Sequence, residues 1–278
     1  MTRTMFTDLI VTSTRNRYVV EARKLSQRKH RQRQGQFLVE GLQLLHMALD
    51  AGGRPIQAFY CPEHVADPEV PALLARLHQA GVPTLTLAPQ VMQALSQREV
   101  SQGIVATFAL FETTLDALAL RGHELVVVLD RLQDPGNMGT LIRTADAVGA
   151  AAVVLIEPCV DPFDPKTVRG SMGSLFNVPL VRTADVPALF AALVRSGLRP
   201  VGASAHDGKA WGEGILGGGV ALVLGNEARG LSADVGAHIH HWAHLPMVGK
   251  AESLNVAVAG SVLMYAWLRE EMRRENRE

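Results

Sequence analysis

The stretch ELVVVLDRLQDPGNMGTLIRTADAVGA, residues 124–150, decides the fold. Its first seven residues form an almost continuous apolar run ending at Asp130, which is typical of a strand buried on both faces of a parallel sheet. A Pro-Gly pair follows, and Asn137 is predicted to be the N-cap of a helix that begins at Met138. Gly149 is expected to end that helix. The stretch therefore predicts one strand–loop–helix unit.

The same alternation continues towards the end of the chain. Further strands are predicted at 151–156, 199–204, 220–225 and 240–246, and helices at 138–148, 186–196 and 252–273. Strands that alternate with helices of this length favour an α/β fold with a mostly parallel sheet. We assign this domain to residues 124–278.

A second alternating pattern precedes it. Strands are predicted in GQFLVEG, IQAFYC and PTLTLA, and helices in LQLLHMALD, PEVPALLARLHQAG and PQVMQALSQ, and this pattern ends near the apolar segment GIVATFAL. We therefore expect a smaller α/β domain over residues 1–110, joined to the second by a linker at 111–123.

Composition limits the classes of protein. With 278 residues, 47% of them hydrophobic and 19% charged, the chain can bury two sizeable cores and is not intrinsically disordered. Cys61 and Cys159 lie far apart without a CxxC pattern, which excludes a disulfide framework and fits a reducing compartment. No apolar run is long enough for a signal-peptide core or a membrane span. A soluble, cytoplasmic protein is expected.

Charge is concentrated near the start of the chain. The formal net charge is zero, but residues 1–40 contain nine Lys and Arg against three acidic residues, a local charge of +6. Such a cluster attracts phosphates whatever the global charge, although it also fits a solvated helix face. The candidates for contact with RNA are Arg15, Arg28, Lys29, Arg31 and Arg33.

Three loops at predicted strand ends carry unusual glycine and polar content: 129–150, 222–232 and 244–270. In parallel sheets, ligands collect at the carboxyl ends of the strands. Arg143 lies on an otherwise small and apolar helix, either as a solvated residue or as a cation for a phosphate or carboxylate. Glu227 follows a strand and a glycine, where it could cap a helix or orient a substrate.

Taken together, the loops resemble a known family. The patterns NxGxxxR (137–143), LGNExxG (224–230) and LPM followed by SLNVAVA (245–259) are similar, in that order, to the three motifs of the SpoU (TrmH-like) RNA 2′-O-ribose methyltransferases of the SPOUT superfamily. The basic first block resembles the L30e-like substrate-binding domain found in some members. The resemblance implies a deep trefoil knot in the second domain, which is an exception to the rule that chains avoid knots.

The resemblance also implies a cofactor and a partner. S-adenosyl-L-methionine is expected in the second domain, and structured RNA is the expected substrate, with ribosomal RNA favoured over transfer RNA because L30e-like folds recognise RNA by shape. The expected cofactor contacts are Ala203, Leu224, Gly225, Leu245, Met247, Ser253 and Leu254. Members dimerise through helices of the knot, so a homodimer with an active site built from both protomers is expected.

Catalytic roles follow by position in the motifs. Arg143 is expected at the ribose hydroxyl, where its permanently charged guanidinium stabilises a developing oxyanion. Asn137, Glu227, Ser253 and Asn255 are expected to position the ribose and the loops. No metal is expected, since the spacing of His238, His240, His241 and His244 fits no common zinc site.

Alternatives stay open at this point. Transfer RNA could be the substrate, the enzyme could confer antibiotic resistance, or the protein could be a non-catalytic ribosome-assembly factor that binds RNA. Intact Asn137, Arg143, Glu227 and Asn255 argue against the last of these. The modified nucleotide and the proton acceptor do not follow from the sequence.

Overall fold

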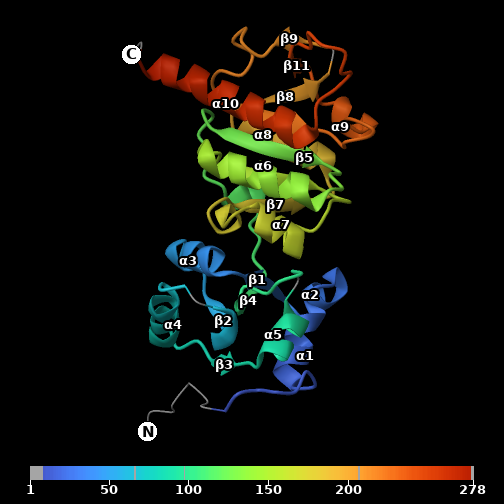
Figure 1. The fold of residues 1–278 in the computed structure, drawn as a ribbon. Coiled ribbons are helices and arrows are strands. Elements are labelled where there is room, and N and C mark those ends of the chain that lie inside the picture. Colours follow the sequence, from blue (N-terminus) through green and yellow to red (C-terminus); the bar gives the residue numbers. More distant parts are fainter. Residues whose placement is uncertain (1–8, 66, 97, 206, 277–278) are drawn as a thin grey trace. The chain divides into compact units, whose positions relative to one another are not determined.

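In a computed structural model the chain forms two compact units, which we describe separately (Figure 1). The structure describes residues 9–65, 67–96, 98–205 and 207–276. No signal peptide was predicted at the N-terminus, and the first eight residues of that terminus lie outside the described ranges. Unit 1 consists of Met1–Leu110 and Asp161–Phe176, and unit 2 of Phe111–Val160 and Asn177–Glu278. Residues 161–176 were expected in the second domain, but in the structure they belong to unit 1.

Unit 1 is built around a four-stranded sheet in the order β1-β4-β2-β3. Strand β4 pairs antiparallel with β1 and β2, and β3 pairs parallel with β2. The elements of unit 1 are α1 (Arg17–Lys24), α2 (Arg28–Gln34), β1 (Gln36–Glu40), α3 (Leu42–Asp50), β2 (Pro55–Tyr60), η1 (Pro62–His64), α4 (Val70–Gln79), β3 (Thr84–Thr86), α5 (Pro89–Leu95), β4 (Ile104–Ala109), α7 (Pro165–Gly170) and η3 (Ser174–Phe176).

The segment 161–176 completes the core of unit 1. Phe37 of β1 lies with its ring centroid 4.8 Å from that of Phe163, and Phe108 of β4 lies 5.1 Å from Phe176. Phe37, Phe108 and Phe163 are buried. Full burial of one phenylalanine contributes about 1.5–3 kcal/mol. Two members of this aromatic cluster are therefore supplied by residues more than fifty positions after the first block ends.

Unit 2 contains a seven-stranded sheet in the order β7-β6-β5-β10-β8-β11-β9, and every strand pair in it is parallel. The elements are η2 (Leu115–Ala117), β5 (Leu125–Asp130), α6 (Pro135–Ala147), β6 (Ala152–Ile156), β7 (Leu180–Thr183), α8 (Val186–Arg195), β8 (Arg199–Ser204), β9 (Lys209–Ala210), β10 (Val220–Leu224), α9 (Ala233–Gly236), β11 (His241–His244) and α10 (Val256–Glu275). The sheet confirms the predicted parallel α/β architecture. Two edge strands, β7 and β9, were not predicted.

The strand order explains why the loops of the three motifs meet. Strands β6 and β7 extend the sheet on one side of β5, whereas β10, β8 and β11 extend it on the other. The direction in which successive strands are added to the sheet therefore switches between β5 and β10, and ligands bind at such a switch point in open parallel sheets. Gly260 lets α10 approach closely here, because an added Cβ would lie 2.5 Å from Leu224 and 2.7 Å from Leu141.

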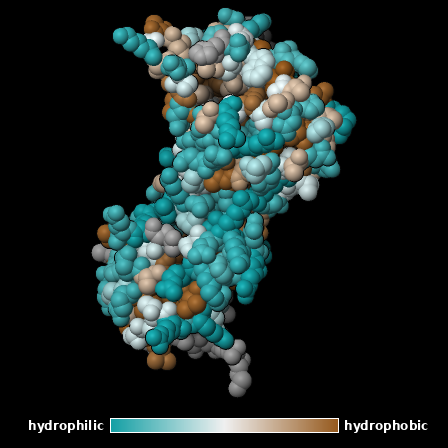
Figure 2. All heavy atoms as spheres, turned by 90° about the vertical axis from the view of Figure 1, so that its right-hand side faces the viewer, coloured by the Kyte–Doolittle hydropathy of each residue, from teal (hydrophilic) through white to brown (hydrophobic). Residues whose placement is uncertain are grey.

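The segment 111–123 is not a free linker. Thr113 pairs with Val181 of β7, and Leu115, Leu118 and Leu120 pack against the core of unit 2. On the face shown in Figure 2, hydrophilic side chains predominate and hydrophobic ones occur in smaller groups. Within the described residues, no helix combines the length and the apolar composition that crossing a bilayer requires.

Candidate active site

The loop after β5 leads into α6 through an aspartate cap. The side chain of Asp134 accepts a hydrogen bond of 2.8 Å from the backbone N–H of Asn137, and Pro135 is the first helical residue. The prediction that Asn137 caps this helix is therefore wrong. Because Asp134 takes the capping role, the amide side chain of Asn137 is available for contacts outside the helix.

Asn137 connects the three motifs in one polar chain. Its Nδ2 donates to Oε1 of Glu227 at 3.0 Å, and its Oδ1 accepts from Nδ2 of Asn255 at 3.0 Å. The carboxylate of Glu227 also lies 3.3 Å from the backbone N–H of Asp134 and 3.4 Å from that of Gln133. The three side chains predicted to act together are thus in direct contact, although they lie about 90 and 118 positions apart.

The loop after β10 is a tight turn held by its own backbone. Asn226 and Gly230 exchange two backbone hydrogen bonds of 2.9 Å, and the amide of Asn226 donates to the carbonyl of Arg131 after β5. An added Cβ on Gly225 would lie 2.3 Å from the carbonyl carbon of Gly230. Glycine is required at Gly225 because the loop folds back on it.

A second link ties the same two strand ends together. Asp130, the last residue of β5, is 1% exposed and accepts hydrogen bonds from the backbone N–H of Ser232 at 2.6 Å and from its hydroxyl at 2.7 Å. Arg131 adopts a positive φ of 54° and its guanidinium pairs with Asp234 at 2.8 Å. The loop after β10 is therefore anchored at both ends to the loop after β5.

The loops after β8, β10 and β11 line one cavity together with the start of α10. All seven residues predicted to contact a cofactor lie on it: Ala203, Leu224, Gly225, Leu245, Met247, Ser253 and Leu254. The sequence did not indicate several others, notably Ser204, Asn226, Val256, Ala259 and Leu263. These residues are direct neighbours of the predicted ones or lie one or two helical turns further along α10. Asn226, Val256 and Ala259 lie inside the quoted motifs, and this is the signal that could have found them; Ser204 and Leu263 had only their position close to predicted residues.

Helix α10 begins at this cavity. Asn255 is its N-cap, and its side-chain oxygen accepts from the backbone N–H groups of Ala257 and Val258 at 2.9 and 3.3 Å. The same side chain donates to Asn137. The helix was predicted to begin at residue 252, four residues earlier. Ser253 and Leu254 instead form part of the loop that lines the cavity.

Arg143 does not lie on the cavity. Its side chain is exposed on α6, and the structure gives it no hydrogen bond or ion pair to any other described residue. Asn137, Glu227 and Asn255 are therefore brought together within one chain, whereas the predicted catalytic guanidinium is not placed beside them.

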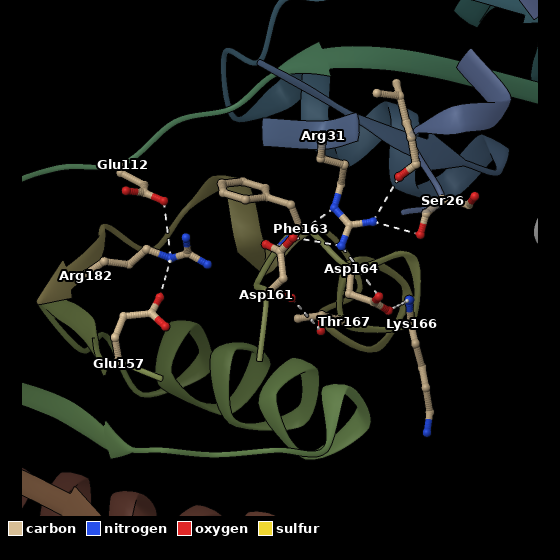
Figure 3. A network of polar contacts seen from close by, with 11 residues as sticks. Ser26, Arg31, Glu112, Glu157, Asp161, Phe163, Asp164, Lys166, Thr167 and Arg182 are labelled. Atoms are coloured by element: carbon tan, nitrogen blue, oxygen red, sulfur yellow. Dashed lines mark hydrogen bonds and ion pairs between the residues drawn. The ribbon is translucent and has the colours of Figure 1, made fainter. Parts of the chain in front are cut away.

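Among the basic residues of unit 1, the structure contradicts the prediction made for Arg31. It was predicted to contact RNA, but its side chain is 2% exposed and lies 2.7 Å from Asp161 and 3.7 Å from Asp164. Figure 3 shows its guanidinium pointing at Asp161, with further bonds of 2.9 and 3.0 Å to the carbonyls of Leu25 and Ser26. A guanidinium that is satisfied on every side and excluded from solvent cannot meet a phosphate. The other candidates, Arg15, Arg28, Lys29 and Arg33, are exposed.

Other chemistries find little support. Cys61 and Cys159 are buried free thiols, and burial raises the pKa of Cys159 to about 12, so this thiol is not a thiolate nucleophile near neutral pH. Among the residues that the structure describes, no group of three or more His, Cys, Asp or Glu side chains is arranged to hold a metal ion.

Comparison with protein families assigns both halves of the chain. Residues 124–265 match the model of the SpoU rRNA Methylase family, and residues 16–106 match that of the MRM3-like substrate binding domain. The first match covers the parallel sheet, the three motifs and the cavity. The second covers nearly all of the first block.

Individual relatives match along almost their full length. The chain is 34% identical over 255 residues to the 23S rRNA (guanosine(2553)-2′-O)-methyltransferase RlmP of Bacillus subtilis, covering 92% of this chain and 97% of the relative. It is 29% identical over 268 residues to the 23S rRNA (uridine(2479)-2′-O)-methyltransferase of Streptomyces viridochromogenes, covering 94% and 92%.

The fold agrees with these matches. The AdoMet-bound rRNA methyltransferase from Sinorhizobium meliloti superimposes with a TM-score of 0.85 at 31% identity, covering 95% of this chain and 98% of that one. Sequence motifs, sheet topology and whole-chain similarity lead to one assignment. This chain belongs to the SpoU rRNA methylase family.

Proposed function

We propose that this protein transfers the methyl group of S-adenosylmethionine to a ribose 2′-hydroxyl of ribosomal RNA. The observation that carries the proposal is the meeting of three distant motifs at one cavity, with Asn137 hydrogen-bonded to both Glu227 and Asn255 beside it. Relatives that match across both units are named as 23S rRNA 2′-O-methyltransferases, which favours ribosomal over transfer RNA. The hydrogen-bonded motif residues disfavour a non-catalytic RNA-binding protein.

The residues of the cavity fit this methyl donor chemically. Leu224, Leu245 and Met247 offer apolar surface for a purine ring, and Ser204 and Ser253 offer hydroxyls for polar groups. The described residues that line the cavity include the carboxylate of Glu227 and no Lys or Arg. Such a lining suits a ligand that carries a sulfonium cation and no phosphate. When bound, S-adenosylmethionine supplies an electrophilic methyl group.

The side chains of the protein then have to orient and activate the ribose. A ribose hydroxyl is a weak nucleophile and loses its proton as it attacks. A guanidinium carries N–H donors and no acceptor, so we assign Arg143 electrostatic stabilisation of the developing oxyanion and of an adjacent phosphate. Glu227 accepts hydrogen bonds from three donors in the loop after β5 and in α6. It is therefore a positioning residue that holds the loops together.

A homodimer would account for the absence of Arg143 from the lining of its own chain's cavity. Val258, Val262 and Tyr265 form an apolar stripe on α10 and are 51%, 39% and 53% exposed. Helix α6, which carries Arg143, packs against α10, and Thr144 contacts Ser261 at 2.9 Å. We propose that this face pairs two copies and sets Arg143 of one protomer beside the cavity of the other. We also propose that unit 2 contains the deep trefoil knot and that the protein is located in the cytoplasm.

The function is tested with purified protein and a labelled methyl donor. The protein is incubated separately with ribosomal and transfer RNA pools, and the labelled position is mapped by its resistance to alkaline cleavage. Label at one ribose of ribosomal RNA supports the proposal. Label in transfer RNA alone, or label on a base, contradicts it.

The dimer is tested by mixing two inactive variants. Arg143→Ala lacks the guanidinium and Met247→Trp fills the cavity. If Arg143 acts across the interface, a mixed dimer contains one intact site, and co-refolded mixtures regain about a quarter of the wild-type rate. If Arg143 acts within its own chain, the mixture stays inactive.

A further inference from the structure

Unit 1 contains a cavity that the proposed methyl transfer does not use. Its volume is about 750 Å³, within the range of sites for small ligands. It lies where residues at the start of α3 meet residues 64, 65, 67 and 69 and residues 98 and 102, and Met172 from the segment 161–176 also lines it. All of these residues belong to unit 1.

Three polar atoms on the walls of this cavity have no partner. Nε2 of His46, Nδ1 of His64 and Nε of Arg98 are buried atoms without a hydrogen bond to any described residue. A buried polar group without a partner is costly, and such groups are rare in native proteins. Three of them around one cavity indicate that a ligand or solvent completes their hydrogen bonds there.

The protonation of His46 follows from its neighbour. Nη1 of Arg76 lies 3.2 Å from Nδ1 of His46, and a guanidinium can only donate, so Nδ1 is the acceptor. In the neutral ring the proton is therefore on Nε2. The nearest carboxylate oxygen, on Glu69, is 4.0 Å away and too far for a hydrogen bond. The Nε2–H of His46 is a donor and the carboxylate of Glu69 is an acceptor, so both kinds of group lie next to each other at the cavity.

The mixture of groups selects one kind of ligand. Met47, Met172 and Val65 supply apolar surface suited to a flat ring. Gln43 and Gln102 add amides that both donate and accept. The lining contains one arginine and two carboxylates, Asp67 and Glu69, a balance of charge that disfavours a phosphate. Apolar faces with hydrogen-bonding edges are the properties of a nucleobase.

We propose that this cavity binds one unpaired, unstacked base of the RNA substrate. The inference rests on the proposed function, which makes RNA the substrate. Sequence-specific recognition of RNA is directed mainly at single-stranded bases that are splayed out and read along their edges. The cavity lies in the part of the chain that matches a substrate-binding family model.

The test measures binding of in vitro transcribed 23S ribosomal RNA to the full-length protein over a series of salt concentrations. Arg98→Ala and His46→Ala are expected to weaken binding about tenfold, as for the loss of a specific contact to a base. The slope of log affinity against log salt should stay unchanged, because no phosphate contact is lost. Arg195→Ala, an exposed change of the same charge in unit 2, should alter neither quantity.

Two results overturn the inference. Wild-type affinity in both variants means that RNA does not enter the cavity, and a shallower salt slope means that Arg98 meets a phosphate. Unchanged S-adenosylmethionine affinity and melting temperature show that a variant is folded. If either variant does not fold, Gln102→Ala is used in its place, because Gln102 is exposed. Failure of the proposed function would appear separately, as absence of methyl transfer by the wild-type protein.

Discussion

Helix α2 of unit 1 and helix α6 of unit 2 each carry an arginine that the sequence marks as an RNA contact, and the structure separates the two. Arg31 is buried, paired with Asp161 and bonded to two carbonyls. Arg143 is exposed and has no partner among the described residues. A buried, paired arginine serves the fold, whereas an exposed, unpaired one is available to a substrate. Local sequence does not distinguish them, because the carboxylate partners of Arg31, Asp161 and Asp164, lie 130 and more positions away.

The largest effect is expected from removing those partners altogether. A fragment of residues 1–110 leaves the charge of Arg31 without Asp161 and lacks Phe163 and Phe176. An unpaired buried charge costs about 3–5 kcal/mol and each phenylalanine about 1.5–3 kcal/mol, together comparable with the stability of a small domain. We expect no cooperative urea transition by circular dichroism. Fusion of residues 161–176 to the fragment through a flexible linker should restore a cooperative transition. Cooperative unfolding of the fragment without this segment would contradict the conclusion that residues 161–176 are needed to complete unit 1.

Substitution of the buried arginine is expected to have the next largest effect. Arg31→Ala removes the guanidinium that pairs with the buried carboxylate of Asp161 and should lower the free energy of unfolding by about 3–5 kcal/mol, measured by urea denaturation. The matched control is Arg33→Ala, two positions along the same helix and exposed, where a change within about 0.5 kcal/mol is expected. Equal losses of unfolding free energy in Arg31→Ala and Arg33→Ala would contradict the conclusion that Arg31 stabilises the fold and Arg33 does not.

Substitution of the exposed arginine should show the opposite pattern. Arg143→Ala is expected to lower the rate of methyl transfer by at least about 10²–10³-fold, the usual loss when one group that stabilises an oxyanion is removed. Stability and the affinity for S-adenosylmethionine should be nearly unchanged, as measured by thermal unfolding and by calorimetry. Loss of cofactor affinity in step with activity would mean that Arg143 has a structural role after all.

The smallest effects are expected from the exposed basic residues that flank Arg31. Neutralising Arg28, Lys29 or Arg33 singly should weaken RNA binding a few-fold. Each phosphate contact that is lost should reduce the slope of log affinity against log salt by about 0.7–0.9. Binding is measured by fluorescence anisotropy between 50 and 200 mM salt, roughly the range over which such contacts are resolved. An unchanged slope in all three variants would place these side chains in solvent.

Much of unit 2 could be predicted because its signals are local. Strands β5, β6, β8 and β10 are short apolar or small-residue runs bounded by turns, and the helices between them show helical spacing of apolar residues. Strand β9 was missed because two residues give too short a pattern, and β7 was missed because its sequence, LVRT, contains an apolar run of only two residues. The N-cap of α6 was misplaced because Asp134 and Asn137 are both good caps, and the path of the loop after β5 decides between them.

The sequence by itself determined the alternation of strands and helices, the parallel character of the second sheet, and the motif residues that line one cavity. These follow from periodicity, glycine placement and residue type, which act over a few neighbouring positions. Only the tertiary structure decided that residues 161–176 complete unit 1, that Arg31 is internal, and that Asn137 joins Glu227 to Asn255. Burial and pairing depend on which distant segments meet in space, and no local pattern carries that information.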